Sequence, residues 1–225
     1  MPLSGFSGSL GQRVYQTLRQ AILSLAYRPG EILRKPDICE ALGVSRSPVA
    51  DAVARLQVDG LVDVIPQAGT FVARFSMQEI REGAFLREAI EVAAIERVAP
   101  VISDGQLDRL RANLALQAAR VAEGDFAGFY AVDGEMHEML LSFTGFAKLA
   151  QVSDTAWLHV HRARQLILPM PGRVQATLAE HAAILAALQA RDPLAARDSI
   201  RAHLRQLITY LEPLERDRPD LFNPA

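Results

Sequence analysis

The order of apolar and polar residues in the first third of the chain predicts three helices followed by a hairpin. Apolar residues recur every three or four positions from Val14 to Leu25, which is the spacing of one buried helical face. Two shorter helices follow over residues 36–42 and 47–59, and each has a proline in its first turn. Two β-like runs come next, joined by a connection of hairpin length: residues 61–65 and 70–74.

Beyond residue 76 the pattern is helical throughout, with glycine and proline marking the interruptions. We expect six helices, at about residues 77–99, 104–122, 125–143, 146–169, 173–190 and 193–212. The segment from Pro213 onwards is charged and contains further prolines, so we expect it to fray. The sequence therefore predicts a mainly α fold with two domains, a small one over residues 10–75 and an antiparallel all-helical bundle over residues 77–212.

Composition excludes several classes of protein. Half of the 225 residues are hydrophobic and 22% are charged, which supports a folded core and excludes wholesale disorder. The longest stretch without a charged residue or histidine is residues 1–12, too short for a membrane helix of about 20 residues. We recognise no secretory signal and expect no membrane association. Cys39 is the only cysteine, which excludes an internal disulfide and suits a cytoplasmic protein.

The charge is distributed unevenly along the chain. Residues 1–75 contain eight Lys and Arg against six Asp and Glu, whereas the remaining residues contain sixteen against twenty. A polyanionic partner would therefore prefer the N-terminal third. The difference is small, so the case for a nucleic-acid partner depends on local pattern.

A helix, a short helix, a tight turn, a second short helix and a hairpin, in this order, are typical of a winged helix-turn-helix. Gly43 permits the positive φ of the turn, and Ser45 or Ser47 can cap the following helix. That helix would enter the major groove of double-stranded DNA with its N-terminal residues leading, where Arg46 can bind guanine or phosphate. A structural helical domain with a surface hairpin is the alternative interpretation. The candidate DNA-contacting residues are Arg34, Lys35, Ser45, Arg46, Ser47 and, at the hairpin tip, Gly69.

Four potential metal ligands fall on inward faces of three predicted helices. Asp133 and His137 are four residues apart and share a face with aromatic residues, while His181 and His203 share faces with aliphatic residues. Three imidazoles and one carboxylate are suitable ligands for Zn²⁺, and also for Ni²⁺, Mn²⁺ or Fe²⁺. Each histidine alone is better explained as a hydrogen-bonded core residue, and the Asp133–His137 pair alone is at least as well explained without a metal.

The N-terminal motif "RPGEIL…ICEALGVSRSPVADAVARLQVDGLV…GTFVA" resembles the winged-helix domain of the GntR superfamily of bacterial transcription regulators over residues 10–74. "LGVSRSPV" is its most specific part. Members of that family usually carry a basic residue where this chain has Ala50, and a glutamate where it has Asp51. The resemblance therefore implies the mode of DNA docking more strongly than its affinity or sequence preference.

Residues 77–212 resemble the FCD ligand-binding domain, an all-helical bundle. Its ligand motif of Asp-x-x-x-His and two later histidines falls on Asp133, His137, His181 and His203. The resemblance implies a metal in the floor of a cavity and a small organic acid or sugar acid as effector. It also implies an effector-binding role for Arg87, in "FLREAIE", and less strongly for Arg162. A surface ion pair between Arg87 and Glu91 is an equally good explanation.

These observations predict a transcription regulator rather than an enzyme, in which a carboxylate effector bound over a metal modulates DNA binding. One short recognition helix reads few bases, so we expect a homodimer on a pseudo-palindromic operator. A metal-dependent hydrolase on the bundle is the first alternative, although "HEML" at His137 is not the H-E-x-x-H motif. A constitutive DNA-binding protein with a structural metal is the second.

Overall fold

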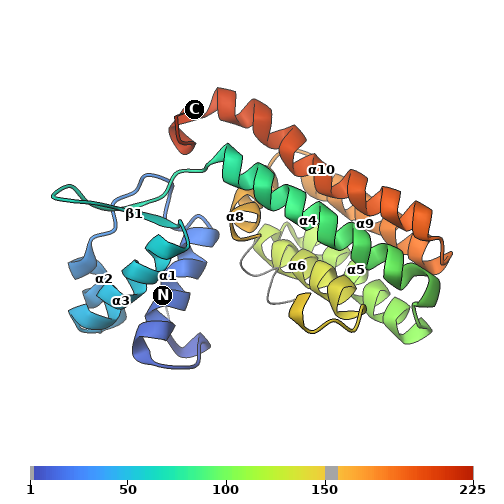
Figure 1. The fold of residues 1–225 in the computed structure, drawn as a ribbon, viewed down its shortest axis with the longest axis horizontal. Helices are drawn as coiled ribbons and strands as arrows, with labels where there is room; N and C mark the ends of the chain where they lie inside the picture. The colour runs from blue at the N-terminus through green and yellow to red at the C-terminus, as the bar shows by residue number, and fades with distance from the viewer. Residues whose placement is uncertain (1–2, 150–156, 225) are drawn as a thin grey trace. The chain divides into compact units, whose positions relative to one another are not determined.

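The computed structural model describes residues 3–149 and 157–224, and the chain divides into two compact units (Figure 1). One unit contains residues Met1–Met77 together with Glu215–Ala225, and the other contains Gln78–Leu214. None of the helices within the described ranges has the length and apolar character required to cross a membrane.

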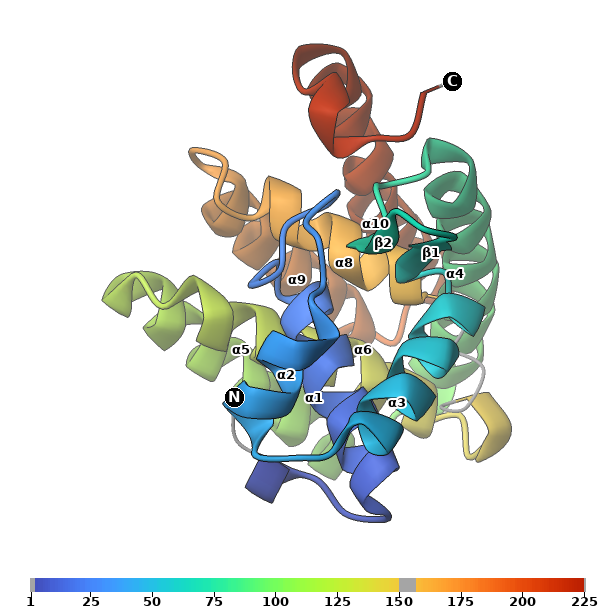
Figure 2. The ribbon, with the colours of Figure 1, turned by 90° about the vertical axis from the view of Figure 1, so that its left-hand side faces the viewer.

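The first unit contains three helices and a hairpin, as the apolar pattern predicts (Figure 2). Its core is formed where α1 packs against α3, through apolar residues at helical spacing such as Leu18 and Leu56, which are fully buried. The elements are α1 (Leu10–Leu23), α2 (Lys35–Leu42), α3 (Arg46–Val58), β1 (Val62–Ile65) and β2 (Gly69–Val72).

The turn between α2 and α3 has the predicted backbone conformation. Gly43 adopts a φ of 64° and ends α2, and its N–H donates to the carbonyl of Glu40. Ser45 occupies the N-cap position of α3, but its side chain makes no capping hydrogen bond. Ser47 is the second residue of that helix, so side-chain capping by either serine is not what starts α3.

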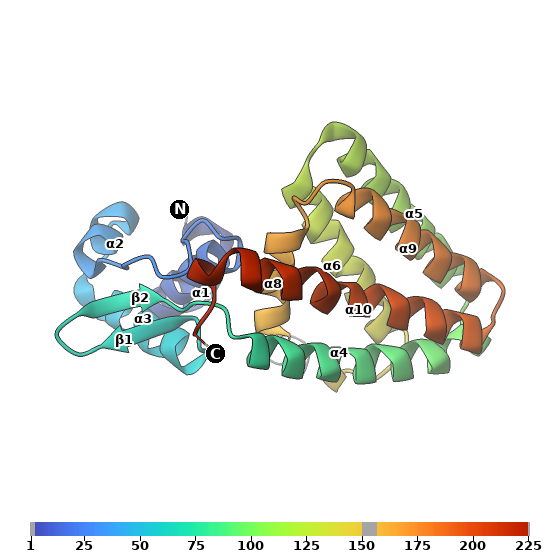
Figure 3. The same ribbon diagram turned by 90° about the horizontal axis from the view of Figure 1, so that it is seen from above.

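The hairpin pairs β1 with β2 in antiparallel register, from Val62 opposite Val72 to Ile65 opposite Gly69 (Figure 3). Gly69 lies at the turn end of the hairpin, where it begins β2 opposite Ile65, and the connection itself consists of residues 66–68. Gly69 has a φ of 134°, and a Cβ there would lie 3.4 Å from Ile32 Cδ1. The contact with Ile32 would be an ordinary one, so the positive φ is what favours glycine at this position.

The C-terminal segment is ordered against the first unit, contrary to the expected fraying. The last helix, α10 (Pro193–Asp217), continues through Pro213, and the chain then returns to the linker at Phe75. Phe222 is buried with its ring centroid 5.7 Å from that of Phe75, whose N–H donates to Leu221 and whose carbonyl accepts from Asn223. Burial of this one aromatic ring explains why a charged, proline-containing tail is held.

The second unit is a helical bundle. The predicted helix over residues 146–169 is only partly borne out, because α8 covers residues 158–167 and residues 150–156 lie outside the described part. The helices are α4 (Met77–Val98), α5 (Asp104–Glu123), α6 (Phe126–Ser142), α8 (Leu158–Ile167), α9 (Arg173–Gln189) and α10.

An apolar core fills one part of the bundle and buried polar residues fill the next. α4, α5, α6, α9 and α10 all contribute to the apolar cluster, which includes Ile95, Leu110 and Ile184. Along α4 the polar residue Glu91 directly precedes this cluster, and along α9 His181 lies one turn before Ile184. The apolar core therefore fixes the helices that present the polar side chains described below.

Candidate functional site

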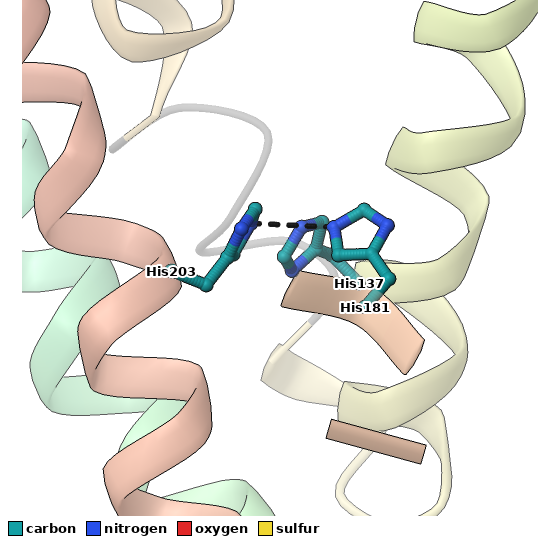
Figure 4. A group of neighbouring side chains, drawn as sticks. All are labelled: His137, His181 and His203. Carbon is teal, nitrogen blue, oxygen red and sulfur yellow. Dashed lines mark hydrogen bonds between the residues drawn. The ribbon is translucent and has the colours of Figure 1, made fainter. Parts of the chain in front are cut away.

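Three histidine side chains from three helices meet inside the bundle (Figure 4). His137 comes from α6, His181 from α9 and His203 from α10, and all three are buried. One nitrogen of each ring lies within 4.8 Å of the corresponding nitrogens of the other two. Residues 44 and 66 positions apart from His137 are thus brought to one point by the packing of three helices.

A side-chain oxygen fixes the orientation of each ring. His137 Nδ1 lies 2.6 Å from Glu91 Oε2, and His203 Nδ1 lies 2.7 Å from Glu180 Oε2. His181 Nδ1 lies 2.7 Å from Gln117 Oε1, and the amide nitrogen of Gln117 donates to Asn113. Because the acceptors are carboxylates and an amide oxygen, each Nδ1 carries the proton in these hydrogen bonds.

The Nε2 atoms are consequently the unprotonated ones. Burial lowers the pKa of His137, lowers that of His181 to about 3 and lowers that of His203 to about 4, so the rings are neutral near pH 7. His181 Nε2 and His203 Nε2 nevertheless approach to 3.4 Å. Two lone pairs that face each other at this distance favour a shared cation between them.

These residues fit a divalent metal ion. Two nitrogens bound tetrahedrally to Zn²⁺, at the usual distance of about 2.0–2.1 Å, lie about 3.4 Å apart. His137 Nε2 and Asp133 Oδ1 are buried and lack a hydrogen-bond partner among the described residues. Outer hydrogen bonds from Nδ1 to oxygen are the usual support of metal-binding histidines.

Asp133 lies beside the three histidines and is held by an arginine. Its Oδ1 is 3.6 Å from His181 Nε2, while its Oδ2 accepts a hydrogen bond from Arg164 of α8. Burial alone would raise the pKa of Asp133, but the Arg164 guanidinium lowers it well below its usual range, so the carboxylate is ionised. The structure thus groups three of the four predicted ligands tightly and places the fourth at their edge.

A small cavity adjoins His203 and is lined by three guanidinium groups, from Arg87, Arg164 and Arg173. It encloses about 20 Å³, which is room for one water molecule. Arg87 does pair with Glu91, at 2.6 Å, but both side chains are buried, so the pair is not the surface pair considered above. Arg162 is fully buried on α8 but is not among the residues that line this cavity.

The candidate DNA-contacting side chains are exposed on the first unit. Arg46 begins α3, flanked by Ser45 and Ser47, so its side chain is presented at the N-terminal end of the helix. Arg34, Lys35 and Gly69 line one surface hollow where the start of α2 meets the turn end of the hairpin. The candidate DNA-contacting residues therefore form two sets on this unit, one at the start of α3 and one around the hollow.

Several polar residues that line the cavity or orient the histidines were not identified from the sequence. Arg164 lies two residues beyond Arg162, and spacing alone does not tell which of them faces the cavity. Arg173 follows Gly172 at the start of α9 and pairs with Glu180 through both guanidinium nitrogens, at 2.7 and 2.8 Å. Gln117 could have been identified from the sequence, because a polar residue at helical spacing from Leu110 falls on the inward face of α5.

Two family models match the chain. Residues 10–72 match the family described as bacterial regulatory proteins, gntR family, and residues 82–206 match the FCD domain. Together the two matches cover the first unit from α1 to β2 and most of the bundle.

Similar proteins agree with both matches over nearly the whole chain. An HTH-type transcriptional regulator of Streptomyces ambofaciens is 31% identical over 93% of this chain and 88% of its own length. The HTH-type transcriptional repressor RspR of Escherichia coli K12 is 28% identical over 95% of this chain and 94% of its own length. The crystal structure of a GntR regulator from Rhodococcus sp. RHA1 superimposes with a TM-score of 0.76 at 28% identity, covering 88% of this chain and 97% of that one.

Proposed function

Because the chain belongs to the GntR family of transcription regulators and carries an FCD domain, we propose that it is a metal-dependent sensor of a small carboxylate that adjusts its own DNA binding. DNA binding and transcription regulation follow from the family itself. The metal, the effector and the coupling between them are proposed here from the buried histidine cluster, which carries the proposal.

The proposed DNA contact uses the N-terminal end of α3. The peptide N–H groups and the helix dipole at this end favour phosphate, and Arg46 adds a planar donor for guanine or phosphate. Arg34 and Lys35 supply further phosphate contacts from the start of α2, and Gly69 allows close approach of the hairpin backbone. One such helix reads few base pairs, so we propose a homodimer on a pseudo-palindromic operator.

The proposed metal ligands are His137, His181 and His203 through Nε2, with Asp133 through Oδ1. A nitrogen-rich set with one carboxylate favours Zn²⁺, with Ni²⁺, Mn²⁺ and Fe²⁺ as alternatives. The metal would supply a fixed positive charge at the cavity wall that His203 forms. It would thereby attract a carboxylate rather than perform a reaction.

The proposed effector site is the cavity lined by guanidinium groups. Arg87 Nη2 and Arg164 Nη1 are buried and lack hydrogen-bond partners among the described residues, so they are suitable donors to a carboxylate. The cavity has room for only one water molecule, so the lining side chains must move to admit a small organic or sugar acid. Such movement gives the effector different affinities for two conformations, which is the requirement for a regulatory ligand.

The test combines elemental analysis of the purified protein with binding to genomic DNA fragments. We expect about one equivalent of metal, which the variant His181→Ala loses and His159→Ala, on a side chain outside the cluster, retains. We expect Arg46→Ala to weaken binding to the selected fragment by about 1–3 kcal/mol. Metal retention in His181→Ala would overturn the metal site, and unchanged footprints in Arg46→Ala would overturn the DNA contact.

The alternatives predict different results in the same preparations. A hydrolase would turn over substrates in the metal-loaded form, and a constitutive DNA-binding protein would show no thermal stabilisation by small carboxylates. A sensor must gain stability when its effector binds.

A further inference from the structure

The arginines around the cavity are joined to the metal-facing histidines by shared carboxylates. Glu91 and Glu180 each accept hydrogen bonds both from a guanidinium group and from an imidazole Nδ1. The two series of contacts involve different helices, so their similarity does not result from one local sequence motif.

The first series of contacts joins Arg87 to His137. Arg87 Nε donates to Glu91 Oε1 at 2.6 Å, and the second oxygen of Glu91 accepts from His137 Nδ1 at 2.6 Å. Glu91 is 2% exposed, so neither contact is screened by bulk water. Burial alone would raise the pKa of Glu91, but Arg87 and His137 lower it well below its usual range, so the carboxylate is charged.

The second series of contacts joins Arg173 to His203. Both terminal nitrogens of Arg173 donate to Glu180, and Glu180 Oε2 also accepts from His203 Nδ1 at 2.7 Å. Glu180 is less buried than Glu91, with 23% of its side chain exposed. The same arrangement of guanidinium, carboxylate and imidazole therefore occurs twice, at two depths.

His181 provides an internal contrast. Its Nδ1 is held by the neutral amide of Gln117, whose nitrogen bonds Asn113 and not an arginine. Of the three converging histidines, two are thus linked to cavity arginines through a carboxylate and one is held by a neutral network.

We propose that Glu91 and Glu180 are positioning residues that couple occupation of the cavity arginines to metal affinity at His137 and His203. This inference rests on the proposed metal site. When an anion draws the guanidinium away, the carboxylate becomes a stronger acceptor for the Nδ1–H of the histidine. The stronger hydrogen bond raises the basicity of Nε2 and makes it a better metal ligand. By linkage, the metal strengthens anion binding by the same factor.

The test measures Zn²⁺ dissociation constants in single and double variants. Arg87→Met imitates withdrawal of the guanidinium, and we expect metal to bind about tenfold more tightly; Glu91→Gln keeps the shape but removes the charge, and we expect about tenfold weaker binding. The double variant is decisive, because we expect the effect of Arg87→Met to vanish when Glu91 is glutamine. If the arginine acted only through space, its effect would persist in that background and overturn the proposal.

Arg205→Met is the matched control, since Arg205 pairs with Glu88 through two nitrogens, at 2.9 and 2.8 Å, on the exposed side of α10. We expect it to leave the metal affinity unchanged. The parallel series Arg173→Met and Glu180→Gln repeats the cycle at the less buried pair, should the Arg87 variants fold poorly.

Co²⁺ absorption spectra separate positioning from loss of the site. We expect the ligand-field bands of Glu91→Gln to keep their intensity, because the ligands remain, while the affinity falls. Arg87→Lys should restore wild-type affinity. Failure of the unmodified protein to bind any metal would refute the proposed function, whereas metal binding with strictly additive variants would refute only the coupling.

Discussion

The two units place their functional side chains in opposite environments. On the winged-helix unit, Arg34, Lys35 and Arg46 are exposed, and the core beneath them is apolar. In the bundle, Asp133 and His181 are fully buried and belong to a network of ion pairs and oriented imidazoles. One unit exposes its charged side chains to solvent, and the other encloses them.

This difference determines how each unit responds to change. An exposed arginine can be removed at little cost to folding, because water replaces its interactions. A buried charge leaves its partner uncompensated when it is removed. Variants of the exposed arginines and lysine of the first unit should therefore change binding without changing stability, and variants of the buried charges of the bundle should change both.

The largest expected effect is in the bundle, for Arg164→Ala. Asp133 would become an uncompensated buried carboxylate, and we expect a loss of about 3–5 kcal/mol in the free energy of unfolding measured with chelator present. Zn²⁺ should restore part of this loss, since a cation beside Asp133 replaces the guanidinium. Arg205→Ala, on the exposed side of α10, should cost less than about 1 kcal/mol. Equal losses in the two variants would contradict the distinction between buried and exposed charges.

Acid should weaken the bundle before it weakens the winged-helix unit. Burial lowers the pKa of His161 to about 3, so between about pH 6.5 and pH 3 the unfolded chain binds a proton that the folded bundle does not. Stability therefore falls as the pH decreases through this window, by on the order of 3 kcal/mol at pH 4 for this group alone.

Trp157, the only tryptophan, lies in the bundle and reports its unfolding by fluorescence. His161→Asn should make the decline in stability between pH 7 and pH 4 less steep, and His159→Asn, on the same helix with its side chain partly in solvent, is the control.

The winged-helix unit should lose stability at alkaline pH instead. Burial and the hydrogen bond to Asp59 raise the pKa of Tyr15 to about 12. The folded unit then keeps a proton that the unfolded chain loses, so its stability falls above about pH 10.

The same contrast explains what the sequence could predict. Helices and hairpin follow from local periodicity, and Asp133 and His137 are predicted to share a face because four residues make about one helical turn. The partners of these residues are not local: Arg164 reaches Asp133 across 31 positions, and Glu91 reaches His137 across 46. Such pairings depend on helix packing, which spacing does not encode. Residues on exposed helix ends need no distant partner, so Arg46 could be named from its motif alone.

The C-terminal tail tests whether the stability of the first unit also depends on a buried side chain. Phe222→Ala should destabilise that unit by about 1–3 kcal/mol, below the usual 3–5 kcal/mol for a buried phenylalanine, because the tail can detach rather than leave a cavity. Hydrogen exchange of the full chain should show lost protection at Phe75, whose N–H bonds Leu221, with little change at the three histidines. Asn223→Ala, with an exposed side chain, is the control. Undiminished protection at Phe75 would show that the tail contributes nothing.

The smallest expected effect is a gain on the DNA-binding surface. Ala50 lies on the exposed side of α3, one turn after Arg46, at the position where the sequence resemblance to the GntR superfamily leads us to expect a basic residue. Ala50→Lys should tighten DNA binding by about 1 kcal/mol or less and steepen the slope of log affinity against log salt by about one, the value for one added phosphate contact. The free energy of unfolding should not change, since the side chain remains in solvent. Ala50→Gln has a similar length without the charge, and Ala112→Lys adds the same charge to the exposed surface of α5. If Ala112→Lys steepened the slope as much as Ala50→Lys, net charge rather than a contact at α3 would account for the gain.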